Sequence, residues 1–388
     1  MASTPSTHPH PLHFMGRAAD SVRRARRVAI VLTMAATGLI TLLAIGIDAG
    51  VVAVATGLVF AVLPVPVYLG LARWIDRFEP EPRDLILFTF FWGATVAVFI
   101  ALVLNTFGEV VVGMTFGREA GSIYGGSISA PVVEESAKGL ALLIIFRRRR
   151  DEFNGVVDGV VYAMLVGLGF AMSENVLYYS KGAVEHGVDG ALMTFVARGI
   201  LTPFAHPLFT SMTGVGLGIA SRATKHRTQV VAPLLGLAGA MGLHSLWNTA
   251  AAAGQAGAVY IFLYVPIFIL MGFLVVIARG REGKLVRREL QPELQANWLT
   301  PAELDMLSSM RGRDRATRWA RRSGGPAARR ALTNVQEAAS ELAFARDRVE
   351  RGLAPATEPA GDQRRLAEAL TEFRCLSAGA GRTPEAAG

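Results

Sequence analysis

The sequence is poor in cysteine and in charge. It contains one cysteine among 388 residues, Cys375, which excludes a disulfide framework and a zinc cluster built on thiolates. Charged residues make up 18% of the chain, against roughly a quarter in soluble domains, and this composition excludes a wholly disordered chain. The net charge of +8 comes from basic residues beside apolar runs, so it does not indicate nucleic-acid binding, and we expect no nucleic-acid partner.

Apolar residues make up 52% of the chain, and the mean hydropathy is +0.38, which favours a polytopic membrane protein. Eight segments approach the ~20 residues that a helix needs to cross a bilayer. The first is too long for a cleaved signal peptide, whose apolar region has about 7–15 residues. The predicted spans are Val28–Ile47, Val51–Arg73, Leu85–Asn105, Ile128–Phe146, Val156–Tyr179, Leu192–Ala220, Val231–Ala252 and Ala258–Ala278.

The distribution of Lys and Arg supports eight spans that cross the membrane in alternating directions. With eight spans and the N-terminus inside, the inner segments hold 20 Lys and Arg and the outer segments hold two. Cytoplasmic loops are enriched in Lys and Arg. We therefore predict an all-α, polytopic bundle of about eight transmembrane helices in the plasma membrane, with both termini cytoplasmic.

Three regions follow from this assignment. Residues 1–27 are predicted to be a disordered basic tail in the cytoplasm, and residues 28–280 the transmembrane domain. Residues 281–388 are predicted to form a small cytoplasmic helical region with a flexible end. We find no catalytic motif in this last region.

Local signals support helices in the C-terminal region. Thr300, Pro301 and Glu303 are typical of a helix start, with Thr as N-cap and Glu as its capping-box partner. Residues 324–326, Gly-Gly-Pro, are predicted to be a linker. The chain is expected to be flexible after Ala378.

Several polar residues lie inside the predicted spans, and they cluster at one depth. At 1.5 Å per residue, Glu134 lies ~9 Å, Glu174 ~8 Å and His244 ~12 Å from the outer edge. Ionisable groups at such depth are costly and usually face a bundle interior or a water-filled cavity. The candidate catalytic residues are Glu134, Glu135, Glu174, His206, His244 and Asn248.

Such a set can activate water. A carboxylate beside a histidine can take a proton from water and return it to a leaving amine, while a second histidine and a carboxamide stabilise an oxyanion. Alternatively, a divalent metal such as zinc could be held by Glu134, Glu174, His206 and His244 and acidify its water. Both schemes describe hydrolysis of a peptide bond within the membrane, and the sequence leaves both open.

Four sequence blocks, in this order, resemble the PrsW family of intramembrane proteases. This family is related to the CAAX prenyl protease and bacteriocin-processing group. The resemblance covers roughly residues 28–280. The blocks are EExxK in residues 131–138, residues 153–159 with 167–178, residues 198–206, and His244-Ser-Leu-Trp-Asn248.

The resemblance implies a bacterial protease of metallo- or glutamic type that takes part in regulated proteolysis. Its substrate would be a membrane-embedded or membrane-adjacent protein, for which an anti-sigma factor is one candidate. Motifs of other intramembrane proteases, HExxH, GxSG and GxGD, are absent from the sequence.

Other interpretations remain. The buried Glu and His residues could form the proton relay of a proton-coupled transporter, although no internal repeat is evident. The chain could also be a non-catalytic scaffold that recruits partners through residues 280–388. Structural readings are that Glu134 pairs with Lys138, that the histidines bond between helices, and that Asp158 and Arg198 lie at the membrane interfaces.

Overall fold

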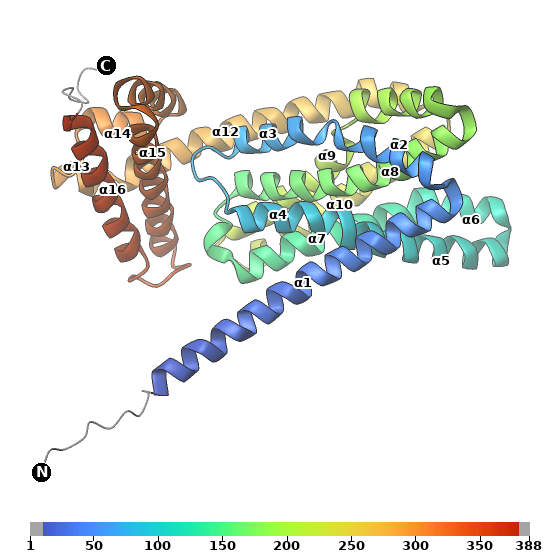
Figure 1. Ribbon diagram of the computed structural model, residues 1–388, viewed down its shortest axis with the longest axis horizontal. Coiled ribbons are helices and arrows are strands. Elements are labelled where there is room, and N and C mark those ends of the chain that lie inside the picture. The colour runs from blue at the N-terminus through green and yellow to red at the C-terminus, as the bar shows by residue number, and fades with distance from the viewer. Residues whose placement is uncertain (1–10, 380–388) are drawn as a thin grey trace, which may run out of the picture.

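The computed structural model describes residues 11–379, and within that range every regular element is a helix (Figure 1). The prediction of an all-α, polytopic membrane protein is confirmed. The membrane part contains α1 Pro11–Ala49, α2 Val51–Val62, α3 Val65–Ile75, α4 Arg83–Phe91, α5 Val98–Phe116, α6 Arg118–Tyr124, α7 Ala130–Arg148, α8 Val156–Phe195, α9 Ala205–Ser221, α10 His226–Ala252, α11 Ala256–Val259 and α12 Val265–Glu289. The C-terminal part contains α13 Gln291–Gln295, α14 Pro301–Leu307, α15 Met310–Glu350 and α16 Pro359–Gly379.

In the described chain, six helical segments are long and apolar enough to cross a membrane. One of them, Val156–Ser221, has 66 residues and contains two of the predicted spans. The six segments thus cover seven of the eight predicted spans. The remaining span corresponds to α7, which is less apolar because it carries Glu134, Glu135 and Lys138.

Helix α8 is the centre of the bundle, and small residues let its neighbours approach it. A Cβ atom on Gly159 would collide with the carbonyl of Gly214 in α9. A Cβ atom on Gly167 would lie 2.8 Å from the backbone of Pro207, next to His206. Close approach through small residues is a common way of packing helices in membranes. Here it brings α9 against α8 at the level of the candidate histidine.

Two predictions about irregular segments were wrong. Residues 11–27 belong to α1, which begins at Pro11, whereas the sequence predicted disorder up to residue 27; residues 1–10 lie outside the described part. Pro is compatible with the first turn of a helix, and the Ala- and Arg-rich stretch that follows favours helix. The predicted linker at residues 324–326 is a kink inside α15, where Gly325 has φ 66°.

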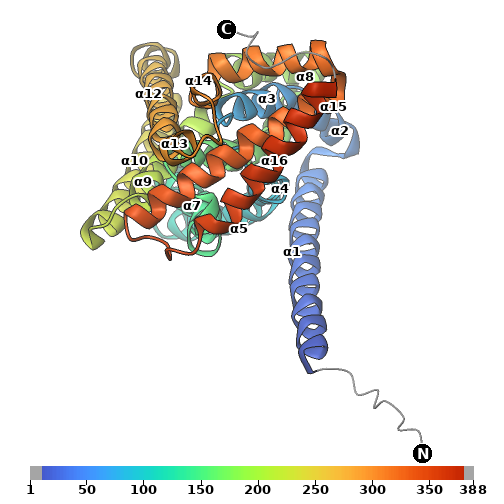
Figure 2. The ribbon, with the colours of Figure 1, turned by 90° about the vertical axis from the view of Figure 1, so that its left-hand side faces the viewer.

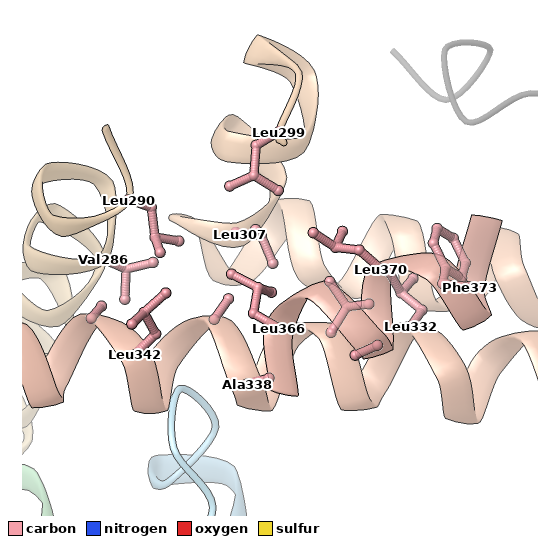
Figure 3. Packing of buried hydrophobic residues seen from close by; sticks show 14 of the residues in the cluster. Val286, Leu290, Leu299, Leu307, Leu332, Ala338, Leu342, Leu366, Leu370 and Phe373 are labelled. Atoms are coloured by element: carbon pink, nitrogen blue, oxygen red, sulfur yellow. The ribbon is translucent and has the colours of Figure 1, made fainter. Parts of the chain in front are cut away.

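The C-terminal helices share one apolar core, part of which is shown in Figure 3. Leu307, Leu332, Leu342 and Leu366 are at most 1% exposed within it. The predicted capping box is present: the Thr300 side chain accepts a hydrogen bond from the backbone N–H of Glu303, and the Glu303 carboxylate accepts one from the N–H of Thr300.

Loops predicted to share one side of the membrane meet in the structure. Arg149 pairs with Asp84 at 3.4 Å, and the Asn154 amide donates to the Glu79 carboxylate at 2.9 Å. Arg222 reaches Asp347 of α15 at 2.7 Å, so the C-terminal helices pack on that same end. Figure 2 looks at this end, where α15 and α16 cross in front of the membrane helices. The alternation of the spans therefore agrees with the arginine distribution, and the absolute orientation stays a prediction.

The loop between α3 and α4 holds buried carboxyl groups. Asp76 and Glu81 are 6% and 7% exposed, the backbone N–H of Glu81 donates to Asp76 at 2.7 Å, and Tyr162 donates its hydroxyl proton to Glu81. Burial, together with the nearby Asp158 carboxyl, holds the pKa of Glu81 well above its ordinary value. The folded protein therefore favours the protonated form of Glu81.

This arrangement predicts that the protein loses stability as pH rises. A raised folded pKa contributes stability that is complete below the ordinary glutamate pKa of about 4.5 and is lost as pH rises through the raised value. We expect the melting temperature in detergent to fall between weakly acidic and alkaline pH, and to fall less in Glu81→Gln. The control is Glu119→Gln on exposed α6; an equal pH slope in both variants would contradict this account.

Candidate active site

Helix α7 supplies three charged side chains within little more than one turn. The Lys138 Nζ atom lies 2.8 Å from Glu135 Oε1 and 3.4 Å from Glu134 Oε2. The predicted pairing of Glu134 with Lys138 is thus present, although the shorter bond is made to Glu135. Helix α7 follows the π-helix η2, Gly125–Ser129, a type of distortion frequent at functional sites.

Two histidines from other helices complete the cluster. His206, in the first turn of α9, places Nδ1 3.0 Å from Lys138 Nζ and Nε2 2.9 Å from Glu174 Oε2 of α8. His244 of α10 places Nδ1 3.1 Å from Glu135 Oε1. The centres of the two imidazole rings are 5.1 Å apart. Five of the six predicted catalytic residues therefore meet, from α7, α8, α9 and α10.

Each histidine has one ring nitrogen beside a carboxylate, while the other nitrogen faces Lys138 in His206 and Glu134 in His244. Glu174 bonds His206 Nε2 and Glu135 bonds His244 Nδ1, so His206 Nδ1 and His244 Nε2 are the nitrogens not engaged by these carboxylates. The second of these lies 3.9 Å from Glu134 Oε2. In metal sites, a carboxylate usually orients each histidine ligand through its other ring nitrogen. The cluster shows this pattern twice.

Glu134, His206 and His244 form a group that could hold a metal ion. Each offers one ligand atom, these atoms lie within 4.8 Å of one another, and all three residues are buried. Two imidazoles and one carboxylate are the donor set of several catalytic zinc sites, so the residues fit such an ion. Glu174, also predicted as a ligand, lies outside this group and is held by His206 and Arg198.

The cluster is almost closed to solvent, with one more open side. Glu135 and Lys138 are 0% exposed, and the remaining members on α7, α9 and α10 are between 2% and 7% exposed. The side chains of Glu174 and Arg198 are 18% and 26% exposed. The π-helix η4, Val196–Leu201, carries Arg198 and therefore borders the more open side.

Arg198 belongs to the site, whereas the sequence suggested an interface anchor. Its guanidinium pairs with Glu174, donates to Asn175 Oδ1 at 2.7 Å, and lies 3.8 Å from the ring centre of Tyr178. Arg198 and Glu174 lie in consecutive predicted spans, and this placement did not reveal their contact. The available signal was that Arg198 begins one of the four sequence blocks, residues 198–206, that carry the resemblance.

Two further polar residues touch the α7 carboxylates. The Thr210 hydroxyl donates to Glu135 Oε2 at 3.0 Å, and the Asn105 amide lies 3.4 Å from Glu134 Oε1. Asn105 in turn accepts a hydrogen bond from Ser129 at 2.9 Å. A carboxamide at the end of an apolar span was a signal that the sequence reasoning did not use.

The predicted residue Asn248 has a different partner. Its amide donates to the carbonyl of Gly126 at 2.8 Å, and Ser245 donates to the carbonyl of Ser127 at 2.6 Å. These bonds fasten α10 to η2. Within residues 11–379, no hydrogen bond joins Asn248 to the Glu and His cluster. Asp158 lies at the opposite end of α8, where it accepts from the N–H of Gly155 at 3.0 Å.

Comparison with known proteins identifies the region that contains the cluster. Residues 81–271 match the family described as "PrsW family intramembrane metalloprotease". "Protease PrsW" of Geobacillus kaustophilus is 33% identical over 39% of this chain and 61% of its own length. The proteins of the same name from Bacillus subtilis and Clostridioides difficile are 31% and 28% identical, over 37% and 40% of this chain and 60% and 61% of theirs.

The chain thus spans about three fifths of the length of these curated relatives. No solved structure matches. All six predicted catalytic residues lie inside the matched region, and α13 to α16 lie outside it.

Proposed function

We propose that the chain is an intramembrane endopeptidase, because residues 81–271 match the PrsW family. The bacterial relatives and the apolar helices identify a bacterial membrane protein. The observation that carries the proposal is the convergence of Glu134, Glu135, Glu174, His206 and His244 in one buried cluster among these helices. The proposed substrate is a membrane protein whose chain reaches the depth of this cluster.

Glu134 is the proposed general base of the metal-free mechanism, and it is the proposed carboxylate ligand if a metal ion is bound. Its carboxylate has one oxygen near the Asn105 amide and the other near Lys138, so both contacts fix its position. It would take a proton from the attacking water and return that proton to the amine of the broken peptide bond. Replacement of water contacts by fixed protein donors lets such a group react without reorganisation of its surroundings.

Glu135 is the proposed positioning residue for His244. It receives bonds from Lys138 and Thr210 as well as from His244, and it is fully buried. A carboxylate with three partners at this depth holds the imidazole in one orientation. Glu174, fixed by Arg198, does the same for His206.

A metal ion fits Glu134, His206 and His244, and zinc is the proposed ion. Zinc, when bound, supplies a Lewis acid that polarises the scissile carbonyl and makes water easier to deprotonate. The Lys138 ammonium lies among the same atoms and already neutralises part of their charge. The alternative is therefore a metal-free mechanism in which the glutamates and histidines act alone.

Water and substrate would enter on the side of η4, because Glu174 and Arg198 are the most exposed members of the site. The comparisons give no support to the proton-coupled transporter.

The proposed function is tested by reconstituting the full chain in proteoliposomes with a single-span reporter protein. We expect two fragments whose new termini lie within the span, mapped by mass spectrometry. An intact reporter combined with proton-coupled solute uptake would instead assign the cluster to transport.

Arg198 provides a test of the positioning role. Arg198→Ala frees Glu174 from its guanidinium partner, and we expect cleavage to fall by roughly 10- to 100-fold, as for other residues that orient ligands. Arg198→Lys should recover part of this loss, because it restores the charge without the second bond to Asn175. The measurement is the initial rate of reporter cleavage; wild-type rates for Arg198→Ala would remove this arginine from the site.

A further inference from the structure

The first half of α15, residues 310–324, carries a regular row of arginines. Arg311, Arg315, Arg318 and Arg322 are separated by four, three and four residues, and at 100° per residue this spacing places them on one face of the helix. All four are exposed. In the described part of the chain, none of them has an ion-pair or hydrogen-bond partner. We call these four residues the basic stripe.

The opposite face of the same half-helix is the packed one. Ala320 is fully buried in the apolar core, and Arg313 is 3% exposed. The Arg313 guanidinium donates to the carbonyls of Leu307 at 2.8 Å and Phe78 at 2.9 Å. It also donates to the Ser340 hydroxyl at 2.7 Å. The fold thus uses the buried arginine and leaves the basic stripe free.

The contacts of Arg313 and Asp314 place the first half of α15 at the edge of the membrane, and the basic stripe lies on the helix face turned away from Arg313. Phe78, which receives the Arg313 bond, lies three residues after Ile75, where the segment Val51–Ile75 ends. Arg77 of the same short loop pairs with Asp314 of α15. The next membrane segment begins at Arg83, so α15 starts beside the point where two spans leave the bilayer.

We propose that the basic stripe binds the phosphate groups of anionic lipids in the leaflet next to α13 to α16. Guanidinium groups bind phosphate through paired hydrogen bonds, and basic helices beside a membrane segment are attracted to anionic leaflets. Four arginines without a protein partner, held at this level by Arg313, are complementary to such a surface. The site lies outside the family match and does not depend on the proposed protease activity.

The test uses the full-length chain in nanodiscs. A fluorescent probe is placed beside the stripe through Ser323→Cys in a Cys375→Ser background, which removes the single native thiol. Its quenching is measured with a trace of nitroxide-labelled phosphatidylglycerol or, separately, with phosphatidylcholine carrying the same nitroxide. We expect phosphatidylglycerol to quench at least about fivefold more strongly, and a variant with all four stripe arginines replaced by glutamine to lose this preference.

A matched control removes the same number of charges outside the stripe. It replaces four other exposed arginines of α15 and α16 with glutamine: Arg321, Arg329, Arg330 and Arg364. This control should keep the preference, and all variants should melt like the parent because the changed residues are exposed. Equal quenching by both lipids in the parent, or equal losses in the two quadruple variants, would overturn the proposal. Displacement of the labelled lipid by added polyuridylate would assign the stripe to nucleic acid instead.

Discussion

Glu134→Gln is expected to reduce cleavage of the single-span reporter by about 10³-fold or more, within the range that a positioned general base contributes. Glutamine keeps the size of the side chain and can still accept a hydrogen bond from Lys138, but it cannot take a proton from water. If Glu134 is instead a metal ligand, the same change weakens the site, so the loss is expected in both schemes.

The control for this experiment is Glu119→Gln, which removes a carboxylate from exposed α6 and should leave the rate unchanged. Both variants should elute and melt as folded protein. A Glu134→Gln protein that cleaves at the wild-type rate would remove the central residue of the proposed mechanism.

Metal removal is expected to have the second large effect. Protein purified without chelator should carry about one zinc per chain, and stripping should abolish cleavage until zinc is restored. His206→Ala and His244→Ala should each lower the bound zinc, because each removes one of three ligands. The measurement is elemental analysis of the same samples used for the cleavage assay.

His226→Ala is the matched control, since His226 lies on the same helix as His244 but at its opposite, exposed end. It should retain both zinc and activity. Full activity after complete stripping would select the metal-free mechanism, in which Glu134 and its neighbours act alone.

The depth of the polar residues was predictable because a bilayer restricts where each helix begins and ends. Counting 1.5 Å per residue from the outer edges placed Glu134, Glu174 and His244 in one layer, and the structure brings their side chains together with His206. The depth of a residue in the membrane does not tell which neighbouring helix its side chain faces. Asn248 and Arg198 illustrate this limit.

Asn248 is one helical turn from His244, and the sequence analysis named both as candidate catalytic residues. The structure gives Asn248 a different partner, because the π-helix η2 presents the carbonyl of Gly126 to it. Such a distortion has no clear sequence pattern, so the contact could not be foreseen. Arg198 was assigned to the membrane interface, whereas it lies in the π-helix η4 and pairs with Glu174.

The lysine in the centre of the cluster has a consequence for the assembly of the protein. Lys138 is fully buried and contacts both α7 carboxylates and His206, so its ammonium group supplies a positive charge within the cluster. Two adjacent carboxylates without a counter-charge would be costly at this depth. The charge of Lys138 therefore lets the helices of a newly inserted chain pack around these carboxylates in the bilayer without a bound metal ion.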